Sequence, residues 1–210
     1  MRALKNCGGT MSDKFGDGRD PYLYPGLNVM RNELGLRQAQ KLEQAAYQFT
    51  ALRAATLDLG PMVRGLPHLC AIHHHLYQDV FDWAGQIREV DIYEGDTRFC
   101  HFEYIEKEGN ALMQQLEDEE WLCGLEKTSF IERLAHYYCE INVLHPFRLG
   151  NGIAQRIFFE QLALHAGFSL DWRGIDPDAW REANQAGAMG DLAPLCAIFS
   201  KVVSEAVESE

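Results

Sequence analysis

The spacing of apolar residues predicts a protein that is mainly helical. Between residues 37 and 59 the apolar side chains recur at about helical spacing, as on one face of an α-helix: Leu42, Ala45, Ala46, Phe49, Leu52, Ala55 and Leu57. Comparable stretches elsewhere end at glycine or begin at Asp-Pro, which are usual helix boundaries. We therefore predict helices over residues 28–34, 37–59, 68–80, 104–119, 128–142, 151–166, 176–184 and 192–207.

Residues 87–101 have a different pattern, which predicts a β-hairpin. β-Branched and aromatic residues stand on both sides of Glu94-Gly95-Asp96, a typical turn sequence. An isolated hairpin is only marginally stable, so this one must lie against the helices. Since no repeat or low-complexity linker interrupts the pattern, we predict a single all-α domain over residues 21–210 with one hairpin.

The first residues of the chain carry two different signals. Residues 1–20 are polar and glycine-rich without periodicity, which predicts a loose, flexible N-terminal segment. The next residues, Asp20-Pro21-Tyr22-Leu23-Tyr24-Pro25-Gly26, combine turn formers with aromatic side chains. We expect these aromatic residues to pin the N-terminal strap to the body of the protein.

Composition excludes several classes of protein. The chain has 210 residues, is 47% hydrophobic and carries a net charge of -12, which suits one globular domain and argues against non-specific nucleic-acid binding. Six scattered cysteines without a C-x-x-C pair indicate reduced thiols. The chain has neither an apolar run of membrane-spanning length nor a secretory leader, so we expect no membrane partner and a cytoplasmic location.

The segment from His145 to Arg156 concentrates the candidate chemistry. Glycines on both sides of Asn151 permit positive φ and a close approach of backbone to a ligand. Free N–H groups in such a turn, followed by a helix N-terminus, form an anion-binding nest. Arg156 could add a bidentate phosphate contact, and His145 is suited to proton abstraction near neutral pH. The alternative is an ordinary junction between a loop and a helix.

Three consecutive histidines, His73-His74-His75, raise the question of a metal site. Consecutive positions on a helix point to different faces, so the three side chains cannot share one ion. We therefore predict no metal site here, and a mixture of surface and core roles.

The same segment resembles the signature of Fic-domain proteins, His-Pro-Phe-x-(Asp/Glu)-Gly-Asn-Gly-Arg-x-x-Arg. The chain departs from it at Leu149, where the family has an acid, and at Ile153, where it has an arginine. The residues that match are His145, Pro146, Phe147, Gly150, Asn151, Gly152 and Arg156. The resemblance implies the all-α Fic fold, with the predicted hairpin as a flap over the active site. It also implies transfer of AMP from ATP to a hydroxyl side chain of a target protein.

The resemblance assigns roles to individual residues. His145 would take the proton from the target hydroxyl, and Phe147 would anchor the loop. The backbone of Gly150, Asn151 and Gly152 would hold the phosphates, the Asn151 amide could add to them, and Arg156 would bind the outer phosphates. The flap would align the target by strand addition, through Val90, Asp91, Ile92, Phe99 and Cys100.

The two departures weaken the implied activity. Leu149 offers no oxygen to a hard cation, so metal binding through this position is excluded, and substrate phosphates and water would hold any Mg²⁺ more weakly. Ile153 removes a positive charge beside the outer phosphates, which Arg148 could replace only in part. We therefore expect a slow or inactive transferase, with a degenerate module that binds a nucleotide or an antitoxin as the alternative. Transfer of UMP, phosphate or phosphocholine stays open, with Trp180 and Asn184 as weak candidates for the nucleoside wall.

The resemblance also implies partners. One is a target protein with a Ser, Thr or Tyr hydroxyl, for which the resemblance to toxin members of the family suggests a type II topoisomerase subunit. The other is a small antitoxin that inserts a glutamate near Arg156. The tail from Ser204 to Ser209 has the Ser-x-x-x-Glu spacing of the family's inhibitory helix but ends in serine, and we interpret this match as chance.

Overall fold

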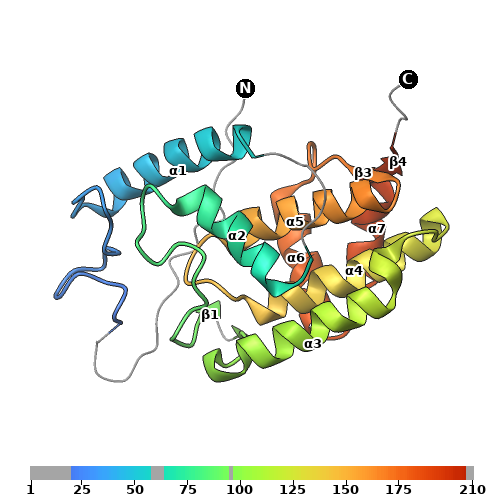
Figure 1. The fold of residues 1–210 in the computed structure, drawn as a ribbon, viewed down its shortest axis with the longest axis horizontal. Helices are drawn as coiled ribbons and strands as arrows, with labels where there is room; N and C mark the ends of the chain where they lie inside the picture. The colour runs from blue at the N-terminus through green and yellow to red at the C-terminus, as the bar shows by residue number, and fades with distance from the viewer. Residues whose placement is uncertain (1–19, 58–63, 95–96, 207–210) are drawn as a thin grey trace.

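The computed structural model describes residues 20–57, 64–94 and 97–206 (Figure 1). Long helices account for most of this part of the chain. In chain order the elements are α1 (Ala39–Ala55), α2 (Leu66–Tyr77), β1 (Tyr93–Glu94), β2 (Thr97–Arg98), the 3-10 turn η1 (Phe102–Tyr104), α3 (Ile105–Asp118), the 3-10 turn η2 (Glu120–Leu122), α4 (Lys127–Leu144), α5 (Asn151–His165), β3 (Phe168–Leu170), α6 (Pro177–Ala188), α7 (Ala193–Val202) and β4 (Val203–Glu205).

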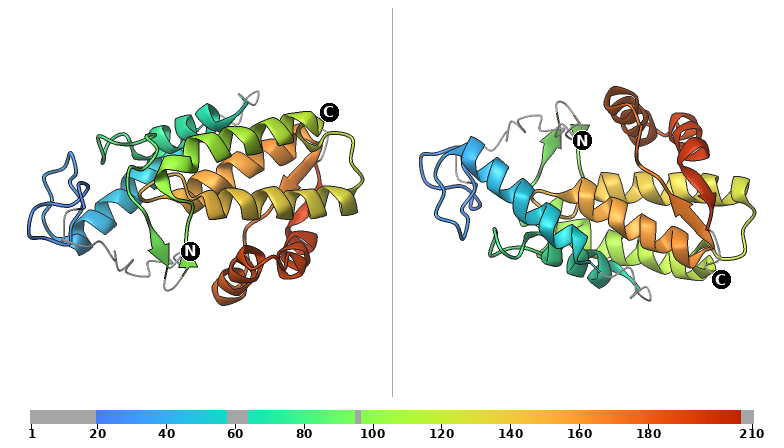
Figure 2. Two further views of the ribbon diagram at one scale, coloured as in Figure 1. Left: turned by 90° about the horizontal axis from the view of Figure 1, so that it is seen from below. Right: turned by 90° about the horizontal axis from the view of Figure 1, so that it is seen from above.

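Helices α4 and α5 form the centre of the body. They pack on each other. Helix α2 covers α5, and three helices pack on α4: α3, α6 and α7. Helix α1 lies outside, on α2 (Figures 1 and 2). Both central helices bury large side chains completely, among them Phe130, Leu134, Phe158 and Phe159. Each such side chain contributes about 1.5–3 kcal/mol by leaving water. The loop between α4 and α5, which carries the sequence motif, is therefore held at both ends by the core.

The hairpin is present as predicted and is short. Strands β1 and β2 pair antiparallel with Tyr93 opposite Arg98 and Glu94 opposite Thr97. The hairpin projects from the helical body on the side to which α6 and α7 also project (Figure 2). Its turn, Gly95-Asp96, lies outside the described residues.

The helix predicted over residues 28–34 is wrong. Leu23 and Met30 instead form an isolated antiparallel bridge. The side chain of Asn32 bonds the backbone of Met30 and Leu36, at 2.9 Å to the Met30 oxygen and 2.7 Å to the Leu36 oxygen. Asparagine competes in this way with helical backbone bonding, and the segment folds as a turn.

The predicted end of the last helix is also wrong, and the strand pair that β3 and β4 form was not predicted. Helix α7 ends at Val202, and β4 then pairs antiparallel with β3, with Phe168 opposite Glu205 and Leu170 opposite Val203. Gly167, at φ +87, turns the chain from α5 into β3. Ser204 and Glu205 thus lie in a strand rather than in an inhibitory helix, and residues 207–209 of that pattern fall outside the described residues.

Aromatic residues pin the strap (residues 20–36) to the body, as predicted. The ring of Tyr22 packs edge-on against Trp83 with centroids 5.4 Å apart, and its hydroxyl accepts a hydrogen bond from the Glu89 backbone N–H (3.1 Å). Asp20 forms a buried ion pair with Arg148 of the motif loop. The prediction of a loose segment over residues 1–20 falls outside the described part of the chain apart from Asp20.

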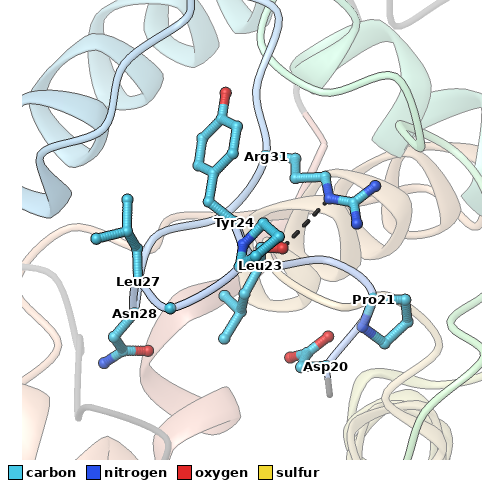
Figure 3. Close-up of a pocket in the computed structure, with 9 residues that line it drawn as sticks. Asp20, Pro21, Leu23, Tyr24, Leu27, Asn28 and Arg31 are labelled. Carbon is cyan, nitrogen blue, oxygen red and sulfur yellow. Dashed lines mark hydrogen bonds between the residues drawn. The ribbon is translucent and has the colours of Figure 1, made fainter. Parts of the chain in front are cut away.

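A hollow of about 620 Å³ opens beside the strap (Figure 3). The described residues that line it all belong to the strap, and Arg31 on its wall donates to the Leu23 carbonyl at 3.2 Å. No residue of the motif loop reaches this hollow, so the candidate chemistry lies elsewhere. In the described part of the chain, no helix is long and apolar enough to cross a lipid bilayer.

Candidate functional site

His145 stands at the point where α4 ends. It adopts a left-handed conformation, φ 46 and ψ 62, and its backbone N–H donates to the Ile141 carbonyl. Its Nδ1 lies 3.2 Å from the Asn142 carbonyl oxygen, which can only accept, so Nδ1 carries the proton and Nε2 is unprotonated. Burial lowers the pKa of His145 to about 3, and the charge of Arg88 adds to this. The imidazole is therefore neutral at physiological pH and presents Nε2 as a base.

A flap residue covers this imidazole. The ring of Phe99, which follows β2, stacks on His145 with centroids 3.8 Å apart and an interplanar angle of 16°. Phe99 itself is buried, and its backbone N–H donates to the Ile92 carbonyl at 3.2 Å. The hairpin thus shields one face of the imidazole from water.

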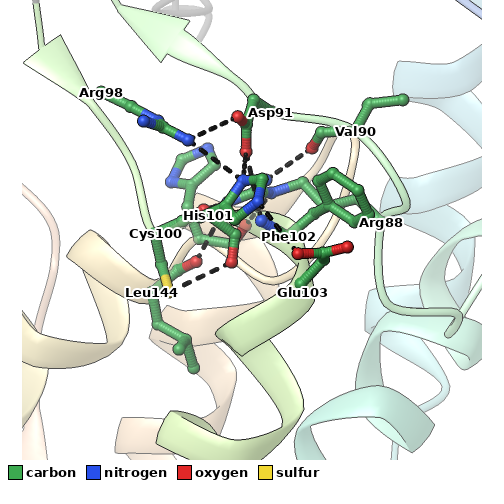
Figure 4. Close-up of polar contacts among 10 residues, drawn as sticks. Arg88, Val90, Asp91, Arg98, Cys100, His101, Phe102, Glu103 and Leu144 are labelled. Atoms are coloured by element: carbon green, nitrogen blue, oxygen red, sulfur yellow. Dashed lines mark hydrogen bonds and ion pairs between the residues drawn. The ribbon is translucent and has the colours of Figure 1, made fainter.

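Arg88 ties the flap to the end of α4 (Figure 4). Arg88 is 1% exposed, and its partners among the described residues are the backbone carbonyls of Val90, Cys100, Leu144 and His145. Burial lowers the pKa of Arg88 to about 10, so the group stays charged at neutral pH. A cation at the C-terminus of a helix is favourable, because the unpaired carbonyls there carry partial negative charge.

The predicted flap residues have distinct environments. Val90, Ile92 and Phe99 are buried, so a docking target would meet their backbone rather than their side chains. Asp91 accepts from Arg98 and His101, each at 2.7 Å (Figure 4). The backbone N–H of Cys100 donates to the Val143 carbonyl at 2.9 Å.

Phe147 and Asn151 hold the motif loop in shape. The Asn151 amide accepts from the Phe147 N–H (2.8 Å) and donates to the Phe147 carbonyl (2.7 Å). Phe147 is fully buried and stacks on His73 at 3.9 Å. Both ends of the Asn151 amide are therefore bonded within the loop, which leaves the backbone N–H of this residue for a ligand.

His73 contacts the motif loop, and this role was not predicted from the sequence. The Gly85 N–H donates to its Nδ1 (2.8 Å), so its Nε2 carries the proton and donates to the Leu149 carbonyl (2.8 Å). Burial lowers the pKa of His73 to about 4. The signal that could have found it is its place on the apolar face of α2, between Leu69 and Leu76.

The three histidines of α2 do point to different partners, as predicted. His73 bonds the motif loop, His74 donates from Nδ1 to the Ala84 carbonyl (3.0 Å), and His75 bonds the Arg53 carbonyl on α1 (3.0 Å). Within the described ranges no group of three or more His, Cys, Asp or Glu could hold a metal ion.

The two glycines of the nest are needed for different reasons. Gly150 has φ +81, and a Cβ there would lie 2.3 Å from the ring of Tyr77. Gly152 is exposed in the first turn of α5, and a Cβ there would meet no protein atom within 4 Å. Packing therefore fixes Gly150, whereas Gly152 keeps the approach to the helix N-terminus open.

Arg156 lies one turn further along α5, between two indole rings. Its guanidinium carbon is 5.4 Å from the ring centroids of both Trp172 and Trp180. Its Nε is buried and has no hydrogen-bond partner in the described residues. Aromatic faces stabilise a guanidinium without using its N–H donors. Trp180, a candidate for the nucleoside wall, thus packs on Arg156, and the Asn184 amide donates to its carbonyl (2.7 Å).

Arg148 does not replace the charge missing at Ile153. Its guanidinium is buried and bound to the Asp20 carboxylate at 2.6 Å. The idea of partial compensation by Arg148 is therefore wrong, because the side chain is used to fasten the strap. Leu149 is 41% exposed and Ile153 is half-buried, so both departures from the Fic signature stand as hydrocarbon side chains beside the nest.

Comparison with known proteins identifies the family. The model described as the Fic/DOC family matches residues 65–163. Proteins of Salmonella typhimurium and Escherichia coli K12, both named "Probable protein adenylyltransferase Fic", are each 76% identical over 200 residues, which is 95% of this chain and 100% of the relative. The chain belongs to the Fic/DOC family.

More distant Fic proteins agree with the fold. The protein adenylyltransferase VbhT of Bartonella schoenbuchensis is 35% identical over 91% of this chain and 41% of its own length. The crystal structure of BepC from Bartonella tribocorum, with bound AMPPNP, matches at a TM-score of 0.80 and 26% identity, over 89% of this chain and 98% of that one. The predicted all-α Fic fold with its hairpin is confirmed.

Proposed function

We propose that this chain is a protein adenylyltransferase that transfers AMP from ATP to a hydroxyl side chain of another protein. One observation carries the proposal: a neutral imidazole with Nε2 unprotonated stands at one end of a motif loop whose other end is an open, glycine-lined helix N-terminus. The names of the family relatives, as protein adenylyltransferases, support the same reaction.

The proposed reaction uses few groups. Nε2 of His145 takes the proton of the target hydroxyl, and the hydroxyl oxygen forms a bond to the α-phosphorus. The bond from that phosphorus to the oxygen bridging to the β-phosphate breaks, and pyrophosphate leaves. The backbone N–H groups of Gly150, Asn151 and Gly152 and the Arg156 guanidinium hold the phosphates. Such transfer depends mainly on positioning and charge stabilisation.

The residues present do not fit the Mg²⁺ ion that usually accompanies ATP. Leu149 has no oxygen to offer, and no step of the proposed reaction passes through a metal. With Ile153 also uncharged, we propose a slow enzyme. Losing one preorganised donor costs on the order of a hundredfold in rate. The second candidate function, a nucleotide- or antitoxin-binding module without turnover, is favoured by these same two positions.

Labelling from ATP tests the transferase. The purified chain is incubated with ATP labelled at the α-phosphate and a cell lysate, and labelled protein bands are counted. We expect slow labelling that His145→Ala abolishes and that the control His165→Ala, at the exposed far end of α5, retains. Binding of ATP without any labelling would favour the binding module.

We also propose the partners that the family resemblance implies. The candidate target is a cytoplasmic type II topoisomerase subunit, which mass spectrometry of the labelled bands would identify or replace. The candidate regulator is a small helical protein that places a glutamate against Arg156. Co-purification from the native operon should recover it with the wild-type chain and not with Arg156→Leu. Equal recovery with both, or none with either, argues against it.

A further inference from the structure

The oxygen atoms next to the nest are already engaged. The Leu149 carbonyl accepts from His73 Nε2 (2.8 Å), while its side chain is hydrocarbon. The side-chain oxygen of Asn151 accepts from the Phe147 N–H (2.8 Å). Since Gly150 and Gly152 have no side chains, none of the four residues from 149 to 152 offers a free side-chain oxygen to a cation.

The carboxylates of neighbouring elements are engaged as well. Asp20 binds Arg148 at 2.6 Å, and Asp91 binds Arg98 and His101, each at 2.7 Å. Glu160, one turn beyond Arg156, is half-buried; burial raises its pKa, and the positive charge of Arg156 works against that rise.

The first two turns of α5 bring positive charge instead. The N-terminus of α5 carries partial positive charge on its free N–H groups. Arg156 adds a full charge, with Nε free of any partner in the described residues. Mg²⁺ loses its water reluctantly and takes oxygen ligands. An ion held on the phosphates beside Leu149 would meet hydrocarbon on the protein side.

We propose that the nest takes its nucleotide as the metal-free anion, with Leu149 as the residue that sets this specificity. The inference rests on the proposed function, because it concerns the same nucleotide site. The ligand class is a nucleoside di- or triphosphate without a divalent cation. Bound Mg²⁺ reduces the negative charge that the helix N-terminus and Arg156 attract, and the protein gives no ligand in return.

Titration calorimetry with ATP tests the proposal. The full chain is titrated once in EDTA and once in excess Mg²⁺, and the ratio of the two dissociation constants is compared between variants. We expect wild type to bind ATP in EDTA as tightly as in Mg²⁺, to within about twofold, or more tightly. We expect Leu149→Glu to bind ATP at least about tenfold more tightly in Mg²⁺ than in EDTA. Leu149→Met, a control of similar size that also lacks an oxygen, is expected to keep the wild-type ratio.

The outcomes separate this proposal from the proposed function. Wild-type binding that Mg²⁺ tightens tenfold or more would overturn the metal-free site, as would equal ratios for wild type and Leu149→Glu. No binding by any variant in either buffer would overturn the nucleotide site itself and this proposal with it. Binding in EDTA without any transfer of AMP would support the metal-free site and contradict the transferase.

Discussion

Arg88 places one buried charge against four backbone carbonyls from two separate parts of the chain. Val90 and Cys100 belong to the flap, whereas Leu144 and His145 end α4. Since the guanidinium bonds all four, it fixes the distance between the flap and the candidate base. His145 is held in a left-handed conformation, which costs a non-glycine residue about 1 kcal/mol. The bonds of Arg88 offset this cost.

We predict that Arg88→Met destabilises the protein strongly. Several buried carbonyls would lose their donor, each at a cost of about 1–3 kcal/mol, so the free energy of unfolding should fall by roughly 3 kcal/mol or more. Arg88→Lys should recover part of this loss. The control Arg173→Met removes an exposed ion pair to Asp171 and should leave the free energy of unfolding close to that of wild type. Urea unfolding measures all three; equal effects of the two methionine variants would contradict this role.

The two nest glycines give a matched pair of variants. Gly150→Ala forces a Cβ to 2.3 Å from Tyr77 at a positive φ, and we expect it to cost about 2–4 kcal/mol of stability. Gly152→Ala meets no protein atom, so its stability should stay within about 1 kcal/mol of wild type. Calorimetry should nevertheless show weaker nucleotide binding by Gly152→Ala. Unchanged affinity would mean that the phosphates do not pass over this residue.

At the scale of elements, periodic segments were predictable and junctions were not. The stripe of 37–59 and the turn at Glu94-Gly95-Asp96 are local patterns, and they gave α1 and the hairpin. Strand β4 was read as helix because its pairing with β3 depends on a segment 35 residues away, Ser169 opposite Ser204. Such long-range pairing leaves no local period in the sequence.

Some residues of the candidate site could be predicted from the sequence, and others could not. His145, the nest and Arg156 are contiguous in the sequence, so a motif could point to them. His73 and Arg88 act through backbone atoms of other segments, and their partners become visible only in three dimensions. The apolar face of α2 could indicate that His73 is buried, but nothing in the sequence indicates which carbonyl it bonds.

Helix α2 carries a pH-dependent contribution to stability. The folded-state pKa of His73 lies near 4, below its unfolded value near 6.5, so the unfolded chain binds the proton first as pH falls. Stability should therefore decline from about pH 6.5 towards pH 4, by about 1.4 kcal/mol per pH unit for this residue. Urea unfolding at several pH values should show a shallower decline for His73→Gln than for wild type. The exposed control His165→Gln should keep the wild-type slope, and equal slopes for all three would contradict the assignment.

At the scale of the whole molecule, the strap closes the structure onto its own site. Asp20 and Arg148 are 128 residues apart in sequence, and both side chains are almost fully buried. Tyr22 accepts from Glu89 at the entrance to the flap. One N-terminal segment therefore contacts both the motif loop and the flap, so the position of each depends on it.

We predict that Asp20→Asn lowers the stability of the protein more than replacement of both Asp20 and Arg148 does. Removing one partner of a buried ion pair costs about 3–5 kcal/mol, because it leaves a buried charge behind. The double variant Asp20→Leu with Arg148→Met should recover most of that loss. Thermal unfolding followed by circular dichroism compares them. A double variant that is less stable than Asp20→Asn would contradict this role for the pair.

The central claim is that the motif loop of this Fic protein keeps its base and its nest and has lost the groups that make transfer fast. The most direct test compares labelling by wild type, His145→Ala and the double variant Leu149→Glu with Ile153→Arg, using ATP labelled at the α-phosphate. We predict slow labelling by wild type, none by His145→Ala, and labelling faster by on the order of a hundredfold or more in the double variant with Mg²⁺. Labelling that survives His145→Ala, or a double variant that labels nothing, would contradict the account.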